Sequence, residues 1–303
     1  MKRSAKTTLN RRKFIATSAI SVGGLALSSV TPAFTKILPS RKQYTVQNII
    51  DLIMNEGNLL PIKGTVDTLK SGEPGMIVTG IVTTMFATVG VIKEAANLGA
   101  NFIIAHEPTF YNHRDDINWV NNNDVVRQKQ ALLKAQHITV WRCHDYIHSL
   151  KPDAMLYGAM KKLNWLPYFT TNTPTITIPQ TSLAALVKHL KTSLGISHLR
   201  IIGDLNQYCS RVTYLPGAPG GQMQVSFAIN QKPDVLIVGE LSEWETAEYI
   251  RDARLLGSNT SLIILGHNMS EDPGMDYFVD WLQPKLTDLK VQHVPSGDPF
   301  TWL

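Results

Sequence analysis

Short apolar runs alternate with amphipathic helical patterns along most of this chain, and this alternation limits the possible fold more than any other feature. Each apolar run is short enough to be a strand: 75–84, 101–106, 138–145, 234–240 and 261–267. Helical patterns lie between or after these runs: 87–99, 124–136 and 243–257. Strand alternating with helix is typical of a parallel sheet covered by helices, so we predict an α/β fold.

A segment rich in proline and threonine divides the pattern into two parts. Residues 167–180 contain three prolines and five threonines, a composition typical of a boundary between lobes. We predict two α/β lobes, at 43–166 and 181–303, joined by a linker at 167–180 that includes an edge strand. Both lobes should have mostly parallel or mixed sheets flanked by helices. In the second lobe we predict a helix at 181–195 and a strand at 224–230.

Residues 1–33 have the composition of an export signal. They contain six basic residues and no acidic one, and an apolar stretch of mostly small residues runs from Phe14 to Val30. The pair Arg11 and Arg12 resembles the twin-arginine signal, which exports proteins that have already folded and acquired a cofactor. We therefore predict a periplasmic or otherwise exported protein. A membrane anchor retained from an uncleaved signal is the alternative.

Charge and cysteine content disfavour several classes of protein. The 303-residue chain has a net charge of +5, but the signal segment supplies this excess, and the other basic residues are dispersed. This dispersion disfavours a nucleic-acid groove, and we expect no membrane association after signal removal. Only Cys143 and Cys209 occur, so a disulfide framework is excluded, although one bridge between them is possible. The chain has no Gly-x-Ser-x-Gly elbow for covalent hydrolysis.

Three clusters of histidine and carboxylate follow predicted strands, at 106–108, 144–148 and 266–271. The two histidines of the second cluster are four residues apart, and so are the histidine and glutamate of the third. This spacing places both side chains on one helix face. Segments 94–108 and 252–268 also share a helix end, a glycine and an Ile-Ile strand before a histidine. We expect both histidines at the carboxyl ends of parallel strands, where open α/β sheets bind ligands.

The first cluster places His106 directly before Glu107. Adjacent strand residues point to opposite faces, so both reach one site only where the strand has ended and Pro108 favours a turn. Imidazole combined with carboxylate suits zinc, iron, manganese, nickel or cobalt, and a bridging carboxylate can hold two ions about 3.5–4 Å apart. The three clusters therefore predict a metal site.

These residues also resemble a known family. Segments 80–112, 140–148 and 263–271 are similar to the Nif-three-like dinuclear metal centre proteins, often labelled GTP cyclohydrolase I type 2 homologues. The resemblance spans nearly all of residues 45–300. It implies two α/β lobes with two metal ions in the cleft between them. It also implies a homo-oligomer, usually a toroidal hexamer.

The family's motifs imply five metal ligands by position: His106, Glu107, His148, His267 and Glu271. The commonest first motif of the family has two adjacent histidines, and Glu107 stands in place of the second. The middle motif has an aspartate where this chain has His148, with Asp145 nearby. One carboxylate has thus moved from the middle motif to the first, and the ligand charge is kept. His144 is expected to be a sixth ligand or to support one.

These ligands favour a metal-dependent hydrolase that binds two divalent ions and uses a metal-bridged water on a small-molecule substrate of unknown identity. His144 and Glu240 are predicted to transfer protons, and Glu243 either shares that role or stabilises the start of a helix. The family label implies GTP cyclohydrolase activity, but no motif of the chain recognises guanine. A metal-binding or assembly ring protein without catalysis is the alternative.

Overall fold

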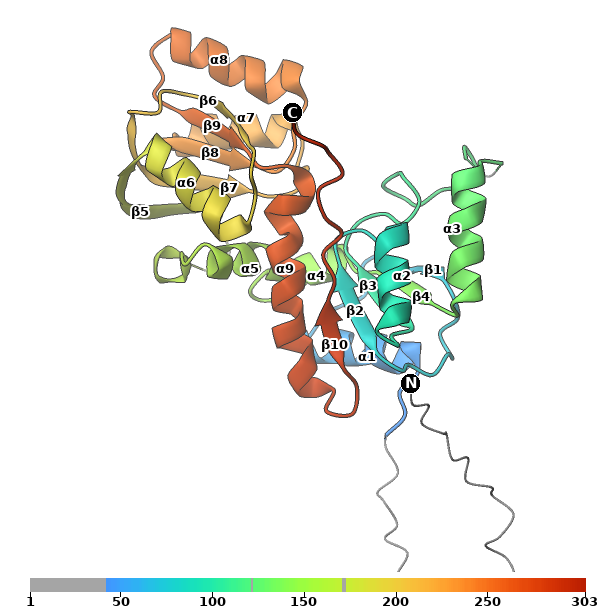
Figure 1. The fold of residues 1–303 in the computed structure, drawn as a ribbon. Coiled ribbons are helices and arrows are strands. Elements are labelled where there is room, and N and C mark those ends of the chain that lie inside the picture. Colours follow the sequence, from blue (N-terminus) through green and yellow to red (C-terminus); the bar gives the residue numbers. More distant parts are fainter. Residues whose placement is uncertain (1–41, 121, 171–172) are drawn as a thin grey trace, which may run out of the picture. The chain divides into compact units, whose positions relative to one another are not determined.

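A computed structural model describes residues 42–120, 122–170 and 173–303 (Figure 1). The predicted export signal at 1–33 lies outside the described residues. Among the helices of the described segments, none is both long enough and apolar enough to cross a membrane. The predicted α/β class is confirmed, because the elements form two five-stranded mixed sheets with helices against them.

The first sheet has the strand order β1-β4-β3-β2-β10. Its strands are β1 (Leu69–Ser71), β2 (Ile81–Thr84), β3 (Phe102–Ala105), β4 (Thr139–Arg142) and β10 (Val291–His293). Strands β10, β2, β3 and β4 run parallel, and β1 is antiparallel to β4. Every residue of β2, β3 and β4 is buried, and eight of the twelve are apolar, as suits strands that are covered on both faces.

Both faces of the first sheet are covered, and alternate residues of β3 show this directly. Ile104 packs into a hydrophobic cluster with α1 (Val46–Glu56) on one face. Ile103 packs into a second cluster with α2 (Val89–Asn97) and α3 (Asp124–Ala135). Successive strand residues point to opposite faces, so a strand covered on both sides needs apolar residues at each position.

The second sheet has the order β5-β7-β8-β9-β6. Its strands are β5 (Thr175–Ser182), β7 (Tyr208–Leu215), β8 (Val235–Val238), β9 (Ser261–Ile264) and β6 (Arg200–Ile202). Strands β7, β8 and β9 run parallel, and the edge strands β5 and β6 are antiparallel to their neighbours. The predicted linker at 167–180 therefore includes most of an edge strand, as the sequence indicated.

Helix α6 (Leu183–Leu194) begins and ends where the sequence predicts. The Ser182 hydroxyl accepts a hydrogen bond from the Ala185 amide at 3.2 Å, and this caps the first turn. Gly195 ends the helix at a φ of +68°, a conformation that glycine adopts without steric cost.

The predicted strand at 224–230 is wrong, because these residues lie in helix α7 (Gly221–Gln231). The buried positions Gln224 and Ala228 are four residues apart, as on one face of a helix. Helix α8 (Glu248–Leu255) follows a π-helical turn at Glu243–Ala247, where one continuous helix was expected. The apolar letters of 224–230 fit either period, and packing on the sheet selected the helix.

The predicted end of the second lobe at residue 303 is also wrong, because the chain returns to the first sheet after β9. Helix α9 (His267–Leu282) places Phe278 in the core of the first sheet, and β10 then pairs with β2. Helix α5 (Ala154–Lys162) crosses α9 closely, since a Cβ added at Gly158 would lie 2.4 Å from the Pro273 carbonyl oxygen. This crossing fixes the start of α9, which carries part of the site described below.

Three short helical elements complete the described chain: α4 (Asp145–Ser149) and the 3-10 turns Leu166–Tyr168 and Gln283–Lys285. The cysteines are free and buried, so the possible bridge between Cys143 and Cys209 is not formed. They belong to different hydrophobic clusters, one under each sheet.

Candidate metal centre

Six side chains that follow the carboxyl ends of three parallel strands converge on one site. Two follow β3, two lie at the end of β4 and in α4, and two lie in the first turns of α9: His106, Glu107, His144, His148, His267 and Glu271. Four of them come from the first sheet and two follow a strand of the second. The site therefore depends on both sheets.

The segment after β3 turns so that two adjacent side chains reach the site. The His106 amide donates to the Thr84 carbonyl at 3.0 Å, and the Glu107 amide donates to the Met85 carbonyl at 2.8 Å. Both residues therefore remain bound to the end of β2 after β3 has ended at Ala105. Their side chains are buried, and the Nε2 atom of His106 lies 3.9 Å from Oε1 of Glu107. The predicted turn at this strand end is confirmed.

A carboxylate outside the predicted clusters fixes the turn that carries His144. Asp67 Oδ1 accepts hydrogen bonds from the amides of His144 at 2.8 Å and Asp145 at 3.1 Å. Its Oδ2 accepts from the Tyr146 amide at 2.8 Å. Amides at the start of a helix lack partners within the helix, so this acid satisfies three of them at α4. Burial raises the pKa of Asp67, and these hydrogen bonds oppose the rise.

Helix α9 begins at the ligand pair itself. Gly266 precedes it with a φ of +93°, and His267 and Glu271 are its first and fifth residues. Their side chains lie on one helix face, with His267 Nε2 3.3 Å from Glu271 Oε2. The predicted helical spacing of this pair is confirmed.

Each of the four imidazoles of the site has an oxygen acceptor at its Nδ1 atom. The distances are 3.3 Å for His106 to the Cys143 carbonyl, 2.9 Å for His144 to Asp145, 3.0 Å for His148 to Asp153 and 2.9 Å for His267 to Glu240. In a neutral ring, an oxygen acceptor keeps the proton on Nδ1, which leaves the Nε2 lone pair available. Metal-binding histidines are held in this way, by a carboxylate or carbonyl behind the ring.

The Nε2 atoms of three of these rings surround Glu107 and Glu271. Glu107 Oε1 lies 3.1 Å from His267 Nε2 and 3.8 Å from His144 Nε2. Glu271 Oε2 lies 3.6 Å from His106 Nε2. The His106 and His144 rings stack with centroids 4.7 Å apart, and His148 packs edge-on at 5.0 Å from His106.

The donor set fits divalent metal ions. Two overlapping groups have ligand atoms within 4.8 Å of one another: His106, His144 and His148, and His106, Glu107 and Glu271. Among the described residues, neither His106 Nε2 nor Glu271 Oε2 has a hydrogen-bond partner, although both atoms are buried. Buried polar atoms are normally paired, so two orphans facing each other at 3.6 Å suit a bound cation.

The carboxylates of the site stabilise positive charge beside them. Burial alone would lower the pKa of His267, but the hydrogen bonds to Glu107 and Glu240 and the negative charge of Glu271 outweigh it and raise the pKa to about 12. Burial also opposes protonation of His148, but Asp153 and the site carboxylates raise its pKa to about 8. Burial would raise the pKa of Glu271, but His106 and His267 lower it. The carboxylates therefore stay ionised and attract cations.

His144 differs from the other rings. Burial and the neighbouring His106 lower its pKa to about 4, against the opposing effects of Asp145 and Glu107. A neutral imidazole with Nδ1 bound to Asp145 presents a free Nε2 toward Glu107. The geometry therefore gives His144 the position of a ligand as readily as that of a proton carrier.

Glycine at position 217 makes room for one site carboxylate. A Cβ added at Gly217 would lie 2.5 Å from Glu271 Oε1, and the residue has a φ of +64°. Its amide donates to the Ser270 hydroxyl at 2.9 Å, which ties the end of β7 to α9. The sequence shows only a glycine-rich turn at 215–222, and the spacing of the motifs does not connect it with Glu271.

A cavity of about 1300 Å³ opens onto the site and is lined by Glu107 and His267. Its wall also includes Lys129 and the C-terminal residues Phe300 and Trp302. The cavity is large enough for a small molecule, which would lie beside Glu107 and His267.

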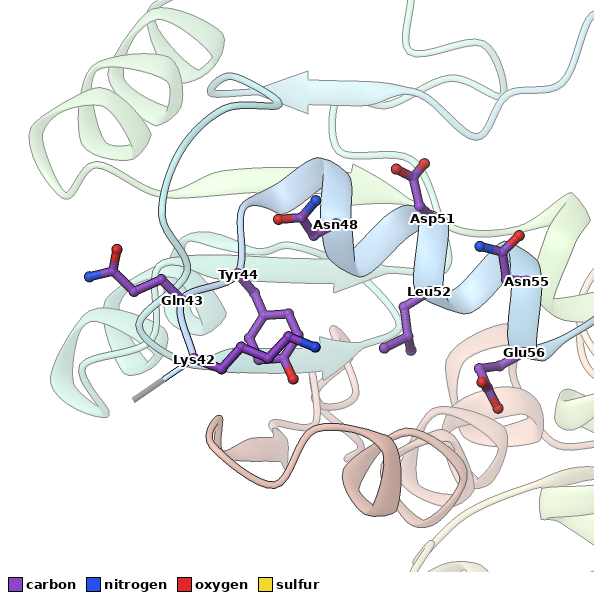
Figure 2. A pocket seen from close by; sticks show the side chains of 8 residues that line it. All are labelled: Lys42, Gln43, Tyr44, Asn48, Asp51, Leu52, Asn55 and Glu56. Carbon is purple, nitrogen blue, oxygen red and sulfur yellow. The ribbon is translucent and has the colours of Figure 1, made fainter. Parts of the chain in front are cut away.

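A smaller hollow of about 420 Å³ lies beside α1, and Figure 2 shows the side chains that line it. Its lining comes from residues 42–56 alone, and Lys42 lies over the Tyr44 ring at 4.7 Å. It contains no histidine or cysteine among its lining residues. The larger cavity is therefore the candidate substrate site.

Three other polar residues lie outside the group of six. Glu240 is largely exposed and contacts His267 Nδ1, so it lies behind a ligand ring. Glu243 pairs with Arg200 at the surface, away from the six residues. His113 lines the cavity and its ring lies 5.8 Å from that of His144.

Comparisons with known proteins identify the family of this chain. Residues 66–299 match the family model described as Duf34/NIF3 (NGG1p interacting factor 3). A GTP cyclohydrolase 1 type 2 homolog from Clostridium perfringens is 24% identical over 248 residues, which cover 78% of this chain and 90% of that protein. A protein of the same name from Escherichia coli K12 is 25% identical over 223 residues, covering 72% and 85%.

Solved structures share the fold. A hypothetical protein from Staphylococcus aureus superposes with a TM-score of 0.68 at 16% identity, covering 86% of this chain and all of that one. A Bacillus cereus protein related to NIF3 gives the same TM-score, identity and coverage. Since the family model spans more than two thirds of the sequence and includes all six site residues, the chain belongs to the Duf34/NIF3 family.

Proposed function

We propose that this protein binds two divalent metal ions and acts as a metal-dependent hydrolase on a small molecule. The observation that carries the proposal is the orientation of the four imidazoles. Each has its Nδ1 atom beside an oxygen acceptor, and the Nε2 atoms of three approach the two buried carboxylates. A structural histidine cluster would not need four rings fixed in this manner.

The residues divide into two ligand groups. His106, His144 and His148 would hold one ion. The carboxylates Glu107 and Glu271, which are also grouped with His106, would hold the other together with His267. This division adds His144 to the five ligands expected by position. Imidazole and carboxylate together suit zinc, iron, manganese, nickel or cobalt.

When bound, the ions would supply the chemistry of two-metal hydrolases, a more acidic water and a positive charge that polarises a substrate oxygen. The residues of the chain provide the rest. Glu240 is exposed at the rim and hydrogen-bonds to His267, so it can exchange protons with solvent at the cavity. The cavity brings a substrate beside Glu107 and His267 and excludes part of the surrounding water.

The name of the curated relatives suggests ring-opening hydrolysis of a purine nucleotide, and we do not extend that substrate to this chain. No motif in the sequence recognises guanine, and an exported enzyme would have little GTP available to it. We propose a small-molecule substrate that is hydrolysed at a carbonyl carbon, a ring carbon or a phosphoryl group.

The first test is the metal content of the purified mature protein, measured by elemental analysis after expression with metal supplement. We expect about two ions per chain, the number that a two-metal site holds. A content below about one ion per chain would overturn metal binding and, with it, the hydrolase.

The second test separates the hydrolase from a metal-binding or assembly protein. Protein reloaded with manganese, zinc or iron is incubated with phosphoester, amide and nucleotide substrates. Hydrolysis that Glu271→Ala abolishes supports the enzyme. A loaded protein that hydrolyses none of them supports the assembly role, in which a homo-oligomer, expected to be a hexamer, presents its surfaces to partners.

We also propose that the protein works after export by the twin-arginine route. The paired arginines and the apolar stretch at 1–33 support this. Cell fractionation of a tagged full-length chain tests it, with replacement of Arg11 and Arg12 by lysine as the export-deficient variant. Retention of both forms in the cytoplasm would contradict the proposal, and a membrane-bound mature form would favour the uncleaved anchor.

A further inference from the structure

We propose that Arg142 is a positioning residue of the metal centre, which holds one oxygen of Glu107 so that the other faces the ions. The inference rests on the proposed function, because it treats Glu107 as a ligand. Arg142 lies outside the three histidine and carboxylate clusters, and it is the last residue of β4. Its side chain is entirely buried.

The guanidinium of Arg142 contacts the segment after β3 at three points. Its Nη2 donates to Glu107 Oε2 at 3.2 Å. Its Nε donates to the His106 carbonyl oxygen at 3.2 Å, and its Nη1 donates to the His113 carbonyl. One side chain on β4 therefore fixes both the backbone at the first ligand and the carboxylate of the second.

A further acid completes the network. Arg142 Nη1 lies 3.5 Å from Asp115 Oδ2, and Lys70 Nζ lies 3.2 Å from the same oxygen. Asp115 Oδ1 accepts from the Phe110 amide at 2.7 Å, which anchors the segment a second time. Two buried cations thus face two buried carboxylates. A buried charge without such partners would be strongly destabilising.

These contacts decide which oxygen of Glu107 is available. Oε2 is bound to Arg142, whereas Oε1 points toward the Nε2 atoms of the rings, 3.1 Å from His267 and 3.8 Å from His144. With Oε2 held, the carboxylate cannot rotate to chelate an ion with both oxygens. Glu107 therefore offers the metal centre one oxygen in a fixed direction.

Arginine suits this position because its planar fork has five N–H donors. It can contact two carboxylates and two carbonyl oxygens at once, which the single ammonium of lysine cannot do in the same plane. Burial also favours arginine, since the guanidinium is less strongly hydrated than an ammonium group.

The test is a double-mutant cycle on zinc affinity, with Zn²⁺ as the probe and a chromophoric chelator as competitor. Arg142→Met and Arg142→Lys are each made in the wild-type chain and in Glu107→Gln. Arg127→Met, on the exposed face of α3, is the matched control. Thermal unfolding of each metal-free variant shows that it folds.

We expect Arg142→Met to weaken zinc binding about 10–100-fold, the usual effect of losing a group that orients a ligand. Arg142→Lys should recover part of this affinity, and Arg127→Met should bind as the wild type does. In the Glu107→Gln background the same changes should have little further effect, because the single amide oxygen of glutamine would face the Arg142 donor and the amide nitrogen would face the ions, so the oriented ligand oxygen is already lost. A crystal structure of zinc-loaded Arg142→Lys should show Glu107 turned from its wild-type position.

Unchanged zinc affinity in both Arg142 variants would overturn the proposal, and so would equal losses with and without Glu107→Gln. An unmoved Glu107 in the crystal structure would overturn it independently of affinity, including when Arg142→Met fails to fold. A wild-type chain and an Arg127→Met chain that both bind no zinc would instead refute the proposed function, on which this inference depends.

Discussion

The two site carboxylates, Glu107 and Glu271, are held in place by opposite means. Glu107 lies on a loop after β3 and is held by a charged partner, since Arg142 binds its Oε2. Glu271 lies on α9 and is held by shape, because Gly217 leaves space for its Oε1. Its Oε2 has no hydrogen-bond partner among the described residues.

This difference shows two ways in which a fold positions an acid. On a loop, the backbone does not fix the side chain, so a buried cation has to direct it. On a helix whose crossing is fixed by glycine contacts, the backbone already directs the side chain, and the surroundings only need to leave room. The position of Glu271 should therefore be more sensitive to the volume of neighbouring side chains, and the position of Glu107 more sensitive to their charge.

The largest effect is expected from removing Glu271. Glu271→Ala should abolish metal uptake, because this acid belongs to the group in which two buried atoms lack partners. The fold should persist, since His267 keeps its contacts with Glu107 and Glu240. Elemental analysis and thermal unfolding measure the two outcomes, and the surface variant Glu248→Ala is the control. Full metal content in Glu271→Ala would contradict the ligand assignment.

The next largest effect is expected from filling the space beside Glu271 at position 217. Gly217→Ala places a Cβ 2.5 Å from Glu271 Oε1, so we expect the carboxylate to move and zinc affinity to fall about 100-fold, the upper end of the usual range for a ligand that loses its orientation. Gly195→Ala is a matched control, because Gly195 has a similar φ of +68° and open space around it.

Both glycine variants should lose about 1–2 kcal/mol of stability from the positive φ alone. Only Gly217→Ala should lose zinc. Equal zinc affinity in the two variants would show that Glu271 is not held by the space at Gly217.

A smaller, graded effect is expected from pH. The metal needs a free Nε2, and the pKa values of His267 (about 12) and His148 (about 8) are raised by neighbouring carboxylates that outweigh burial. Zinc uptake at pH 7 should therefore release protons. As the pH is lowered, zinc affinity should fall about tenfold per pH unit for each proton that zinc displaces. Competition titrations between pH 8 and pH 6 measure the slope.

Protonation of the same histidines weakens zinc binding but stabilises the metal-free fold. Raised histidine pKa values stabilise it fully below the unfolded value of about 6.5. For His148 this stability is lost as pH rises from there through about 8. Asp153→Asn should remove this part of the pH dependence, and chemical unfolding of both chains at pH 6 and pH 9 tests it. Zinc affinity independent of pH would contradict the protonation assigned to the rings.

The smallest effect is expected at the rim. Glu240 is largely exposed and orients His267 from behind, so Glu240→Gln should weaken zinc about tenfold, at the lower end of the range for such partners. If Glu240 also transfers protons, turnover of a substrate should fall more than zinc affinity does. Glu243→Gln, at the surface beside Arg200, is the control.

Much of the site could be predicted from sequence because it follows strands. His106, Glu107, His148, His267 and Glu271 all stand after apolar runs, and the structure brings these five together. The sequence similarity between segments 94–108 and 252–268 corresponds to only a partial structural similarity. Both histidines follow parallel strands, but β3 is flanked on both sides by parallel strands, whereas β9 lies beside an antiparallel edge strand.

The sequence by itself determined the α/β class, the strand ends that carry the site residues and the helical pairing of His267 with Glu271, because these depend on local periodicity. Tertiary structure alone decided that β10 returns to the first sheet, that 224–230 is a helix and that Asp67, Arg142 and Gly217 support the site. These features depend on contacts between residues far apart in the chain. Local patterns carry no record of such contacts, since a buried arginine or a glycine beside a carboxylate has no periodic signature.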